Sequence, residues 1–464
     1  MTDLTTIFSE ETNFIVLKFG GSSVAEVNHW DTIASQAQYH LEQGNKPVLV
    51  LSALKNVSNL LEALLHQALA GVHPNAITHL KELHLGFAAK LSLAILDKLT
   101  PVFERIEIEC EAIYSSQEIS PKRHAAIVSC GELLSTLIGE AYLTKAGLNP
   151  LWFDAREILK ATNHSDEWHH YTSAQCNYTA NEQVRQKLLG QDGPLITQGF
   201  IASDECGDTV LLGREGSDTS ASYFGAILNA AEVQIWTDVT GIFSSNPREI
   251  NNTQAIQSLS YEQANQMARL GAKVLHPRAV TPAQKNNIPL RVKCTSEPDH
   301  PGTLISNELL NEQALTAIVY EPETTLIKVL SKSDDSEKKL ENNSKEQTVS
   351  RLSSILNALG YDPLLNSQQQ DTLYSIWIYA NSDQPKMNDQ SLKERLQDVV
   401  EEFNNSLSVD SSIGLISLIG HPDKVPQEVS EQSRLKLVEN DLTFLMVDSK
   451  DCLKIAQKLH DQLI

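Results

Sequence analysis

The chain has 464 residues, of which 21% are charged and 41% hydrophobic, a balance typical of a globular protein of about three domains. Its formal net charge of −22 argues against nucleic-acid and membrane partners, and we find no apolar run that predicts a helix crossing a bilayer. The six scattered cysteines form no CxxC pair, so we expect a reducing, cytoplasmic setting with neither a zinc site nor disulfides.

The first predicted element is a buried strand, Phe14-Ile15-Val16-Leu17, which runs directly into Lys18-Phe19-Gly20-Gly21-Ser22-Ser23. Because glycine lacks Cβ, the backbone N–H groups of this turn can approach a phosphate closely. We expect Ser22 and Ser23 to cap a helix running to about Gln43, and Lys18 to supply a positive charge for a phosphoryl group. On these residues alone, an ordinary strand–turn–helix with a surface lysine explains the pattern equally well.

Strand-like and helical segments alternate from residue 14 to residue 305. Strand-like runs occur at 47–51, 195–197, 233–236 and 289–292, and a long helical region extends from about 76 to 145. This alternation predicts an α/β fold with a mostly parallel sheet covered by helices on both faces.

Two polar residues in this region are candidates for ligand contact. Ser58 stands in the strand–loop–helix joint 52–61, where it is expected to cap the helix, a role that does not exclude contact with a ligand. Glu132 lies in otherwise apolar helical surroundings, so a buried carboxylate there would need a cation such as a ligand ammonium. The alternative for Glu132 is an exposed helical glutamate. The three histidines of 164–170 are expected in a solvated loop, since no i,i+4 pairing organises a metal site.

The segment Gly213-Arg214-Glu215-Gly216-Ser217-Asp218 precedes a predicted helix. Arg214 offers a planar fork suited to a carboxylate, and Ser217 offers a further donor. Asp218 would lie in the first helical turn, where a carboxylate is favoured and can orient a lysine. A capped helix start with a surface ion pair would give the same pattern.

Two later motifs are weaker. The run 236–243, Trp-Thr-Asp-Val-Thr-Gly-Ile-Phe, places Thr237 and Asp238 at the end of a predicted strand, the edge at which α/β folds bind ligands, and Arg248 follows within reach of a phosphate. The run 271–277 then places Lys273 near a turn before Pro277, a plausible first helical residue.

The pattern changes near residue 310. Strand-like runs at 315–320, 324–330, 374–379, 415–419 and 442–447 alternate with helical patterns at 347–359, 391–403 and 451–463. We expect one or two small α+β units here, with Ser331–Glu346 as a mobile, solvated loop.

In their order and separation, KFGGSSVA, TQGF, GREGSD, WTDVTGIF, GAKVLHP and GTLI resemble the aspartate kinases of the amino acid kinase family. The likeness is strongest to the monofunctional, lysine-sensitive type. It implies an amino acid kinase domain over 14–306 and an ACT-like regulatory region over 314–464, made of two small α+β units of which the second is shortened.

The resemblance also implies a role for each motif. Lys18 and Asp218 would be catalytic, with Asp218 organising the lysines; Arg214 would take the α-carboxylate of aspartate and Glu132 its ammonium. The residues implied to bind L-aspartate are Ser58, Glu132, Phe200, Arg214, Gly216 and Ser217. Those implied to bind ATP are Lys18, Gly20, Gly21, Ser22, Thr237, Asp238, Phe243, Arg248, Lys273 and Val274.

The implied reaction is the Mg²⁺-ATP-dependent phosphorylation of the aspartate side chain to 4-phospho-L-aspartate, the first step toward lysine, threonine and methionine. Because the acceptor is already a carboxylate, no general base is needed. A homodimer formed through the ACT-like region is implied as well. The alternatives are a related kinase acting on another acid, such as glutamate, and a catalytically weak regulatory subunit.

The chain departs from this family pattern at several positions. Glu215 stands where glycine is common, so we expect its carboxylate to point away from the ligands. Phe243 replaces a usual tyrosine, Asn246 a usual aspartate and Ser58 a threonine. The usual effector motifs are replaced at 345–350, 361–363 and 366–368. We therefore expect weakened or lost feedback by lysine.

Overall fold

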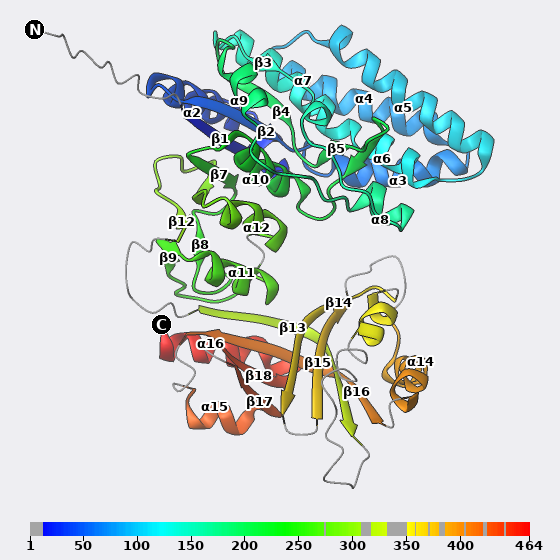
Figure 1. Ribbon diagram of the computed structural model, residues 1–464, viewed down its shortest axis with the longest axis vertical. Helices are drawn as coiled ribbons and strands as arrows, with labels where there is room; N and C mark the ends of the chain where they lie inside the picture. Colours follow the sequence, from blue (N-terminus) through cyan, green and yellow to red (C-terminus); the bar gives the residue numbers. More distant parts are fainter. Residues whose placement is uncertain are drawn as a thin grey trace, which may run out of the picture. The chain divides into compact units, whose positions relative to one another are not determined.

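The structure is a computed structural model that describes residues 13–272, 275–307, 317–331, 350–357, 359–369, 372–379, 386–402, 405–420, 425–439 and 442–464 (Figure 1). It forms two compact units. The first comprises 1–242, 256–265 and 275–311, and the second comprises 243–255, 266–274 and 312–464. The grouping of 243–255 and 266–274 with the C-terminal region was not indicated by the sequence, and the domain boundary at 306–314 stays a prediction.

An eight-stranded sheet in the order β10-β12-β11-β7-β1-β2-β4-β3 forms the centre of the first unit. Its neighbouring strands are parallel except for the antiparallel pair β11–β12, so the mostly parallel sheet is confirmed. The bounds are β1 Phe14–Phe19, β2 Lys46–Leu51, β3 Leu151–Trp152, β4 Leu195–Gln198, β7 Glu232–Thr237, β10 Ser258–Leu259, β11 Leu290–Cys294 and β12 Thr303–Ile305. Two short antiparallel strands, β5 Ile201–Ser203 and β6 Thr209–Leu211, form a separate hairpin.

Helices pack on this sheet because their buried faces are small or apolar. All thirteen residues of α10 are buried along β1, β2 and β7, and a Cβ on Gly225 would lie 2.5 Å from Val233 Cγ2. Helix α7 packs along β2, β3 and β4, and α4 lies beside α5 (Figure 1). The helices are α1 Gly21–Val24, α2 His29–Glu42, α3 Val57–Leu69, α4 His73–Lys90, α5 Leu96–Ser116, α6 Pro121–Val128, α7 Cys130–Lys145, α8 Glu167–Thr172, α9 Glu182–Leu189, α10 Gly216–Leu228 and α12 Pro277–Lys285, with a 3-10 turn η1 Ala155–Glu157.

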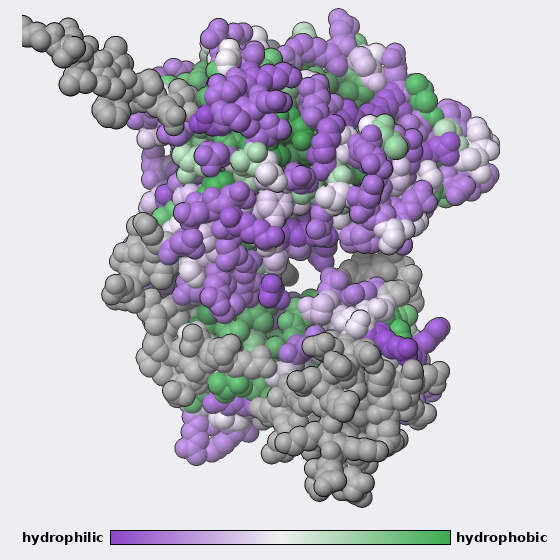
Figure 2. Space-filling model, in the orientation of Figure 1, coloured by the Kyte–Doolittle hydropathy of each residue, from purple (hydrophilic) through white to green (hydrophobic). Residues whose placement is uncertain are grey.

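The expectation that no stretch has the length and composition of a membrane span needs one correction. Among the described residues, the helical stretch Pro121–Lys145 passes that test, and 78% of its most apolar window is buried inside the protein. This stretch comprises α6 and α7, which are core helices here. The visible face of the first unit is mainly hydrophilic (Figure 2).

Two predictions of helix capping are wrong. Gly20, not a serine, caps the short helix α1, and α2 begins only at His29. The hydroxyl of Ser23 instead pairs with the hydroxyl of Thr295 at the end of β11, at 2.7 Å. Ser58 does not cap α3, because Asn56, in the left-handed conformation with φ 68°, occupies the N-cap position. Pro277 does open α12 as predicted, with His276 as the cap.

A six-stranded antiparallel sheet in the order β14-β15-β13-β16-β18-β17 forms the second unit. Its elements are β13 Ala317–Ser331, a helical stretch at 350–357, β14 Tyr361–Gln369, β15 Thr372–Tyr379, α14 Asp389–Glu402, β16 Asn405–Ile419, α15 Gln427–Gln432, β17 Leu435–Glu439, β18 Leu442–Asp448, a 3-10 turn η3 Ser449–Asp451 and α16 Cys452–Leu463. Three elements contain residues of both units: β8 Ile242–Phe243, β9 Ala255–Ile256 and α11 Tyr261–Arg269.

Two long strands run through the whole second unit. The predicted strands 315–320 and 324–330 are one strand, β13, with an irregular register between Glu321 and Thr324. Strand β16 pairs with it and starts ten residues before the predicted run at 415. Separate apolar clusters lie near the two ends of these strands, one around Ile416 and Leu445 and one around Ile327 and Trp377. Apart from Ser331, the predicted loop Ser331–Glu346 lies outside the described residues.

Candidate active site

An ion pair joins the end of β1 to the start of α10. Lys18 Nζ lies 2.5 Å from Asp218 Oδ1, and the two side chains are only 11% and 8% exposed. The register of the sheet explains the meeting, because Lys18 pairs with Ile235 of β7 and α10 packs across both strands. The two residues predicted to be catalytic are therefore adjacent, with little access to water.

The two glycines after β1 have close neighbours. A Cβ on Gly20 would lie 3.3 Å from Lys18 Nζ, and a Cβ on Gly21 would lie 3.0 Å from the carbonyl oxygen of Ala53. The Gly20 N–H donates to the carbonyl of Trp236 at 3.3 Å. Ser22 is half-buried beside them in α1. The turn thus leaves the space next to the Lys18 ammonium free of side chains.

Glu132 is a buried carboxylate with one unused oxygen. Glu132 is only 3% exposed. Its Oε1 accepts a hydrogen bond from the Ala53 N–H at 3.3 Å, whereas its Oε2 has no hydrogen-bond partner. Burial raises the pKa of Glu132 to about 8, against the opposing effect of the Ala53 hydrogen bond. An exposed helical glutamate is thereby excluded, and an ammonium group would satisfy the orphaned oxygen.

Ser58 lies in the first turn of α3, next to Val57. A Cβ on Gly131 would lie 3.2 Å from Val57 Cγ1 and 2.9 Å from Ala53 Cβ, so the starts of α3 and α7 are in close contact. Ser58 is half-buried. This contact brings the Ser58 turn near the residue that precedes Glu132.

Phe200 and the start of α10 are built around two glycines. A Cβ on Gly216 would lie 2.6 Å from Phe200 Cδ2, and a Cβ on Gly199 would lie 2.6 Å from both Cβ and Oγ of Ser217. Phe200 has φ 67°, and its N–H donates to Ser220 Oγ at 2.8 Å. A left-handed phenylalanine costs conformational energy, which points to a residue held in place by its surroundings.

Arg214 and Glu215 are exposed beside this turn, and Arg214 has an interaction partner within the chain. Glu215 caps α10 with φ 50°. Loss of hydration and the charge of Asp218 raise the pKa of Glu215, whereas Lys18 and Arg214 lower it. The carboxylate of Glu215 therefore belongs to the same charged neighbourhood as the buried ion pair. That it points away from the ligands stays a prediction.

Thr237 and Asp238 follow β7, the strand next to β1. Thr237 Oγ1 donates to Asp238 Oδ1 at 3.2 Å, and the Thr237 carbonyl accepts from the Thr295 N–H at 2.9 Å. Both residues lie at the same sheet edge as Lys18, as predicted for the carboxyl ends of parallel strands.

Four further residues are predicted at the nucleotide site: Phe243, Arg248, Lys273 and Val274. Phe243 and Arg248 belong to the second unit, where Phe243 is half-buried, Arg248 is exposed and its N–H donates to Asn246 Oδ1 at 3.1 Å. Lys273 and Val274 lie outside the described residues.

Sequence reasoning missed two backbone contributions to the site. The N–H of Ala53 holds Glu132, and Gly199 admits Ser217 to close contact. The signals were present in the printed sequence, because Ala53 follows a buried strand and Gly199 follows another. Neither residue has a polar side chain, so its residue type alone does not indicate a role in the site.

The described residues contain no cluster of three or more histidine, cysteine, aspartate or glutamate side chains able to hold a metal ion. The ring centroids of His164 and His169 lie 4.1 Å apart, with the rings tilted by 36°, and the two residues do not form such a cluster. The assembled site therefore offers a lysine beside a glycine turn, an adjacent aspartate and a buried carboxylate with one open acceptor. Such a set is chemically suited to an anionic group at Lys18 and an ammonium group at Glu132.

Comparisons with known proteins agree with this chemistry. A sequence profile of the amino acid kinase family matches residues 13–294. Lysine-sensitive aspartokinase 3 of Escherichia coli is 32% identical over 315 residues, covering 68% of each chain. Chloroplastic aspartokinase 3 of Arabidopsis thaliana is 32% identical over 329 residues, covering 68% of this chain and 57% of the relative.

A solved structure extends the likeness along nearly the whole chain. The crystal structure of E. coli aspartokinase III in complex with aspartate and ADP matches with a TM-score of 0.77 at 26% identity. The match covers 97% of this chain and 99% of that structure.

Proposed function

The chain belongs to the amino acid kinase family, and from this premise we propose that it is an aspartokinase that phosphorylates the side-chain carboxylate of L-aspartate with ATP to give 4-phospho-L-aspartate. The observation that carries the proposal is buried Glu132, whose free Oε2 lacks the cation that a free α-amino acid would bring. The aspartokinase relatives and the likeness to a structure holding aspartate and ADP support the same activity.

We assign the residues of the site as follows. Glu132 takes the α-ammonium of aspartate and Arg214 its α-carboxylate, with Ser58, Phe200, Gly216 and Ser217 completing the contacts. Lys18, Gly20, Gly21 and Ser22 hold the phosphoryl group in transfer and the β-phosphate. The N–H groups of Gly21 and Ser22 are the assigned donors, because the Gly20 N–H donates to the carbonyl of Trp236. Thr237, Asp238, Phe243, Arg248, Lys273 and Val274 are assigned to the rest of the nucleotide.

The buried pair of Lys18 and Asp218 suits phosphoryl transfer. In the transition state, negative charge spreads over the oxygens of the transferred group, and a fixed ammonium stabilises it. Asp218 holds Lys18 in place before substrates arrive, so little reorganisation is needed. Because aspartate attacks through a carboxylate oxygen, the step needs positioning and charge neutralisation rather than proton removal.

We expect Mg²⁺ to be required and to arrive with the nucleotide. The described residues offer no acidic cluster for a resident ion, which fits a metal held chiefly by phosphate oxygens and water. When bound there, Mg²⁺ neutralises part of the phosphate charge. We also propose a cytoplasmic location and a homodimer formed through the region after residue 314.

A hydroxamate assay for acyl phosphate tests the proposal against its alternatives. We expect turnover with aspartate and little with glutamate or N-acetylglutamate. Preferential turnover of another acid would favour a kinase with that acceptor. Absence of turnover on all three acids would favour a regulatory subunit. The variant Lys18→Ala reports the background of the assay, and equal turnover by this variant would remove Lys18 from the mechanism.

A further inference from the structure

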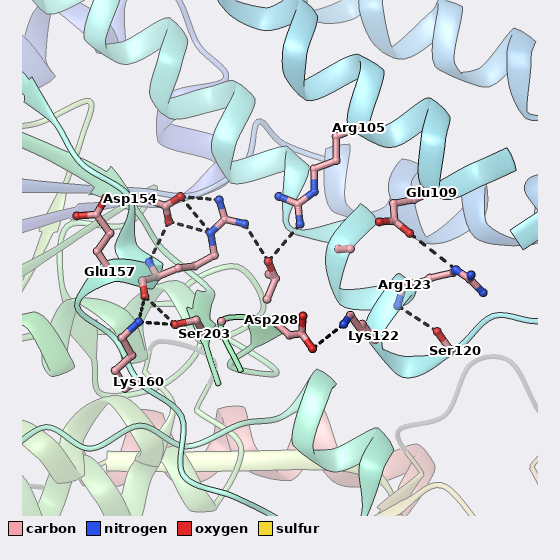
Figure 3. A pocket seen from close by; sticks show the side chains of 14 residues that line it. Arg105, Glu109, Ser120, Lys122, Arg123, Asp154, Glu157, Lys160, Ser203 and Asp208 are labelled. Carbon is pink, nitrogen blue, oxygen red and sulfur yellow. Dashed lines mark hydrogen bonds and ion pairs between the residues drawn. The ribbon is translucent and has the colours of Figure 1, made fainter. Parts of the chain in front are cut away.

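A polar cavity lies in the first unit, apart from the residues assigned to the reaction. It has a volume of about 820 Å³. Its walls come from α5, α6, η1 and the hairpin β5–β6 (Figure 3). Sites for small organic ligands measure roughly 300–1,000 Å³, so the cavity is large enough for a metabolite.

The cavity wall is rich in charge of both signs. Five cationic residues line it: Arg105, Lys122, Arg123, Arg156 and Lys160. Four acidic residues also line it: Glu109, Asp154, Glu157 and Asp208. A positive excess is unusual on a chain whose net charge is −22, because its average field repels anions.

Ion pairs neutralise three of the cations. Lys122 lies 2.7 Å from Asp208, Arg156 lies 2.5 Å from Asp154, and Arg123 lies 3.8 Å from Glu109 (Figure 3). Within the part of the chain that the structure describes, Arg105 and Lys160 have no acidic partner within 4.0 Å.

The two remaining cations bond only to neutral oxygens. Lys160 Nζ donates to Ser203 Oγ at 2.8 Å and to the Arg156 carbonyl at 2.6 Å. Arg105 Nη2 donates to Thr209 Oγ1 at 3.3 Å. A hydroxyl or carbonyl accepts a hydrogen bond without cancelling the positive charge, so both cations keep their capacity for an anion.

Thr209 is the point at which two guanidinium groups converge. Its Oγ1 also accepts from Arg156 Nη1 at 2.8 Å, and the residue is 6% exposed. Two guanidinium groups on one buried neutral oxygen repel each other. Asp154 forms an ion pair with Arg156, whereas Arg105 reaches that carboxylate only through its longer-range charge. A phosphate or carboxylate group placed between the two guanidinium groups would relieve that repulsion and accept from both planar forks.

We propose that this cavity is a second ligand site, which binds a small anion bearing phosphate or carboxylate groups through Arg105, Arg156 and Lys160. The ligand is a small molecule with more than one anionic group, because the cations are spread around a cavity much larger than a single phosphate. Glu157, an exposed acid on the wall, disfavours a ligand that is anionic along its whole length.

The hairpin β5–β6 links the cavity to Phe200 and Arg214, which are assigned to the aspartate site. A coupling between the two sites therefore rests on the proposed function. The hairpin that carries Thr209 begins next to Phe200 and ends shortly before Arg214. An anion that draws Arg105 and Arg156 from Thr209 would loosen the anchoring of this hairpin. We expect the bound anion to raise the KM for aspartate and to leave kcat nearly unchanged.

Cys206 provides a local readout that does not depend on turnover. It lies in the hairpin turn next to Gly207 and Asp208, which line the cavity, and it is the exposed one among six free cysteines. We would measure its labelling rate by iodoacetamide during titration with pyrophosphate or with citrate. A saturable change in the labelling rate with either anion supports the site and identifies the preferred group, and no change with both overturns the proposal.

Matched variants separate this cavity from the nucleotide site. Arg105→Gln should weaken anion binding by about tenfold or more. Cys206 labelling and calorimetry both measure this affinity. Lys98→Gln removes a positive charge from the same helix, where Lys98 pairs with Glu140 at 2.9 Å, and should leave binding unchanged. Lys160→Gln repeats the test should Arg105→Gln misfold.

If Arg105→Gln and Lys160→Gln both bound the anion with the affinity of the wild-type protein, the proposal would be overturned. Inactivity toward aspartate would overturn the proposed function alone, because the labelling experiment needs no substrate. A bound anion that changes the labelling rate of Cys206 and leaves the KM for aspartate unchanged would overturn the coupling and keep the site.

Discussion

Lys18 and Asp218 form a buried ion pair in which Nζ and Oδ1 are 2.5 Å apart. Removing one member of such a pair leaves an uncompensated charge away from water, which costs more than the pair contributes. A single substitution at either position therefore changes folding stability as well as charge in the site. The two effects have to be separated before a loss of activity is assigned to catalysis.

We predict that Lys18→Met abolishes phosphoryl transfer and lowers the free energy of unfolding by about 3–5 kcal/mol. The double variant Lys18→Met/Asp218→Leu removes both charges, so it should recover much of the stability and none of the activity. Urea unfolding followed by circular dichroism measures the first quantity, and the hydroxamate assay measures the second.

The matched control is Lys98→Met on α5, which breaks an ion pair with Glu140 that is partly open to water. Exposed pairs contribute about 1 kcal/mol or less, so this variant should keep both stability and turnover. Substantial turnover by the Lys18→Met/Asp218→Leu enzyme would contradict the assigned role of Lys18.

The second prediction concerns the pH dependence of unfolding. Burial raises the pKa of Glu132 from 4.5 to about 8, so between these values the folded protein holds a proton that the unfolded chain has released. The contribution of Glu132 to stability is therefore greatest below pH 4.5 and falls as pH rises toward 8, by up to about 1.4 kcal/mol per pH unit. Glu132→Gln should flatten this part of the curve, whereas Glu140→Gln on the same helix should not.

The same carboxyl should control aspartate binding. An ammonium group is held by the ionised form of Glu132, so binding near neutral pH should release a proton and the KM for aspartate should fall as pH approaches 8. In Glu132→Gln we expect the KM to rise about tenfold or more and to lose this trend. Calorimetry in buffers of different ionisation enthalpy detects the proton. A KM independent of pH in the wild-type protein would argue against Glu132 as the ammonium partner.

The central fold could be predicted because its signals are local. Buried strands such as Phe14–Phe19 are continuous apolar runs, and the alternation of strands with helices predicts a parallel sheet. Neighbouring parallel strands bring their carboxyl ends together, and the pairing of β1 with β7 places Lys18 and Thr237 at one edge. The motifs near those ends supplied the rest of the candidate site.

Features that depend on long-range contacts could not be predicted. Ser23 has the residue type of a helix cap, yet its hydroxyl pairs with Thr295, far along the chain. The register of β13 with β16 decides that two predicted strands are one. Arg105, Arg156 and Thr209 come from three separate elements, and their convergence is visible only in the folded chain.

The third prediction tests the close packing at the substrate turn. A Cβ on Gly199 would lie 2.6 Å from Ser217 Cβ and 2.9 Å from Ser217 Cα, a distance that requires the backbone to move. We expect Gly199→Ala to lower stability by about 1–3 kcal/mol and to raise the KM for aspartate. The matched change Gly86→Ala lies in the exposed interior of α4 with no atom within 4 Å. It should stabilise the protein by up to about 1 kcal/mol. Equal effects of the two changes would contradict this argument.

The fourth prediction concerns the acidic cap of α10. Glu215 is exposed, yet its charge interacts with those of Asp218 and Lys18. If the carboxylate points away from the ligands, Glu215→Gln should lower the KM values for ATP and aspartate only a few-fold at low ionic strength. The difference should vanish near 1 M salt, where the screening length is about 3 Å. A much larger change that persists in salt would place the carboxylate against a substrate. Glu205→Gln, on the exposed hairpin turn, is the control.

The last prediction is that lysine does not inhibit this enzyme at millimolar concentration. An amino-acid effector needs polar groups for its ammonium and carboxylate, and the motifs that usually supply them are replaced at 361–363 and 366–368, within β14. Tyr361 is fully buried with its ring 4.9 Å from that of Tyr379, and Asn366 Oδ1 accepts from Ser375 Oγ. The neighbouring replacement at 345–349 lies outside the described residues.

Two measurements check this prediction independently. Turnover should be the same with lysine as with an equal concentration of alanine, which controls for ionic strength and for a generic amino-acid effect. Lysine should also fail to raise the unfolding temperature, because a ligand bound only to the folded state stabilises it in proportion to the logarithm of its concentration above Kd. Inhibition together with a rise in unfolding temperature would show that an effector site persists.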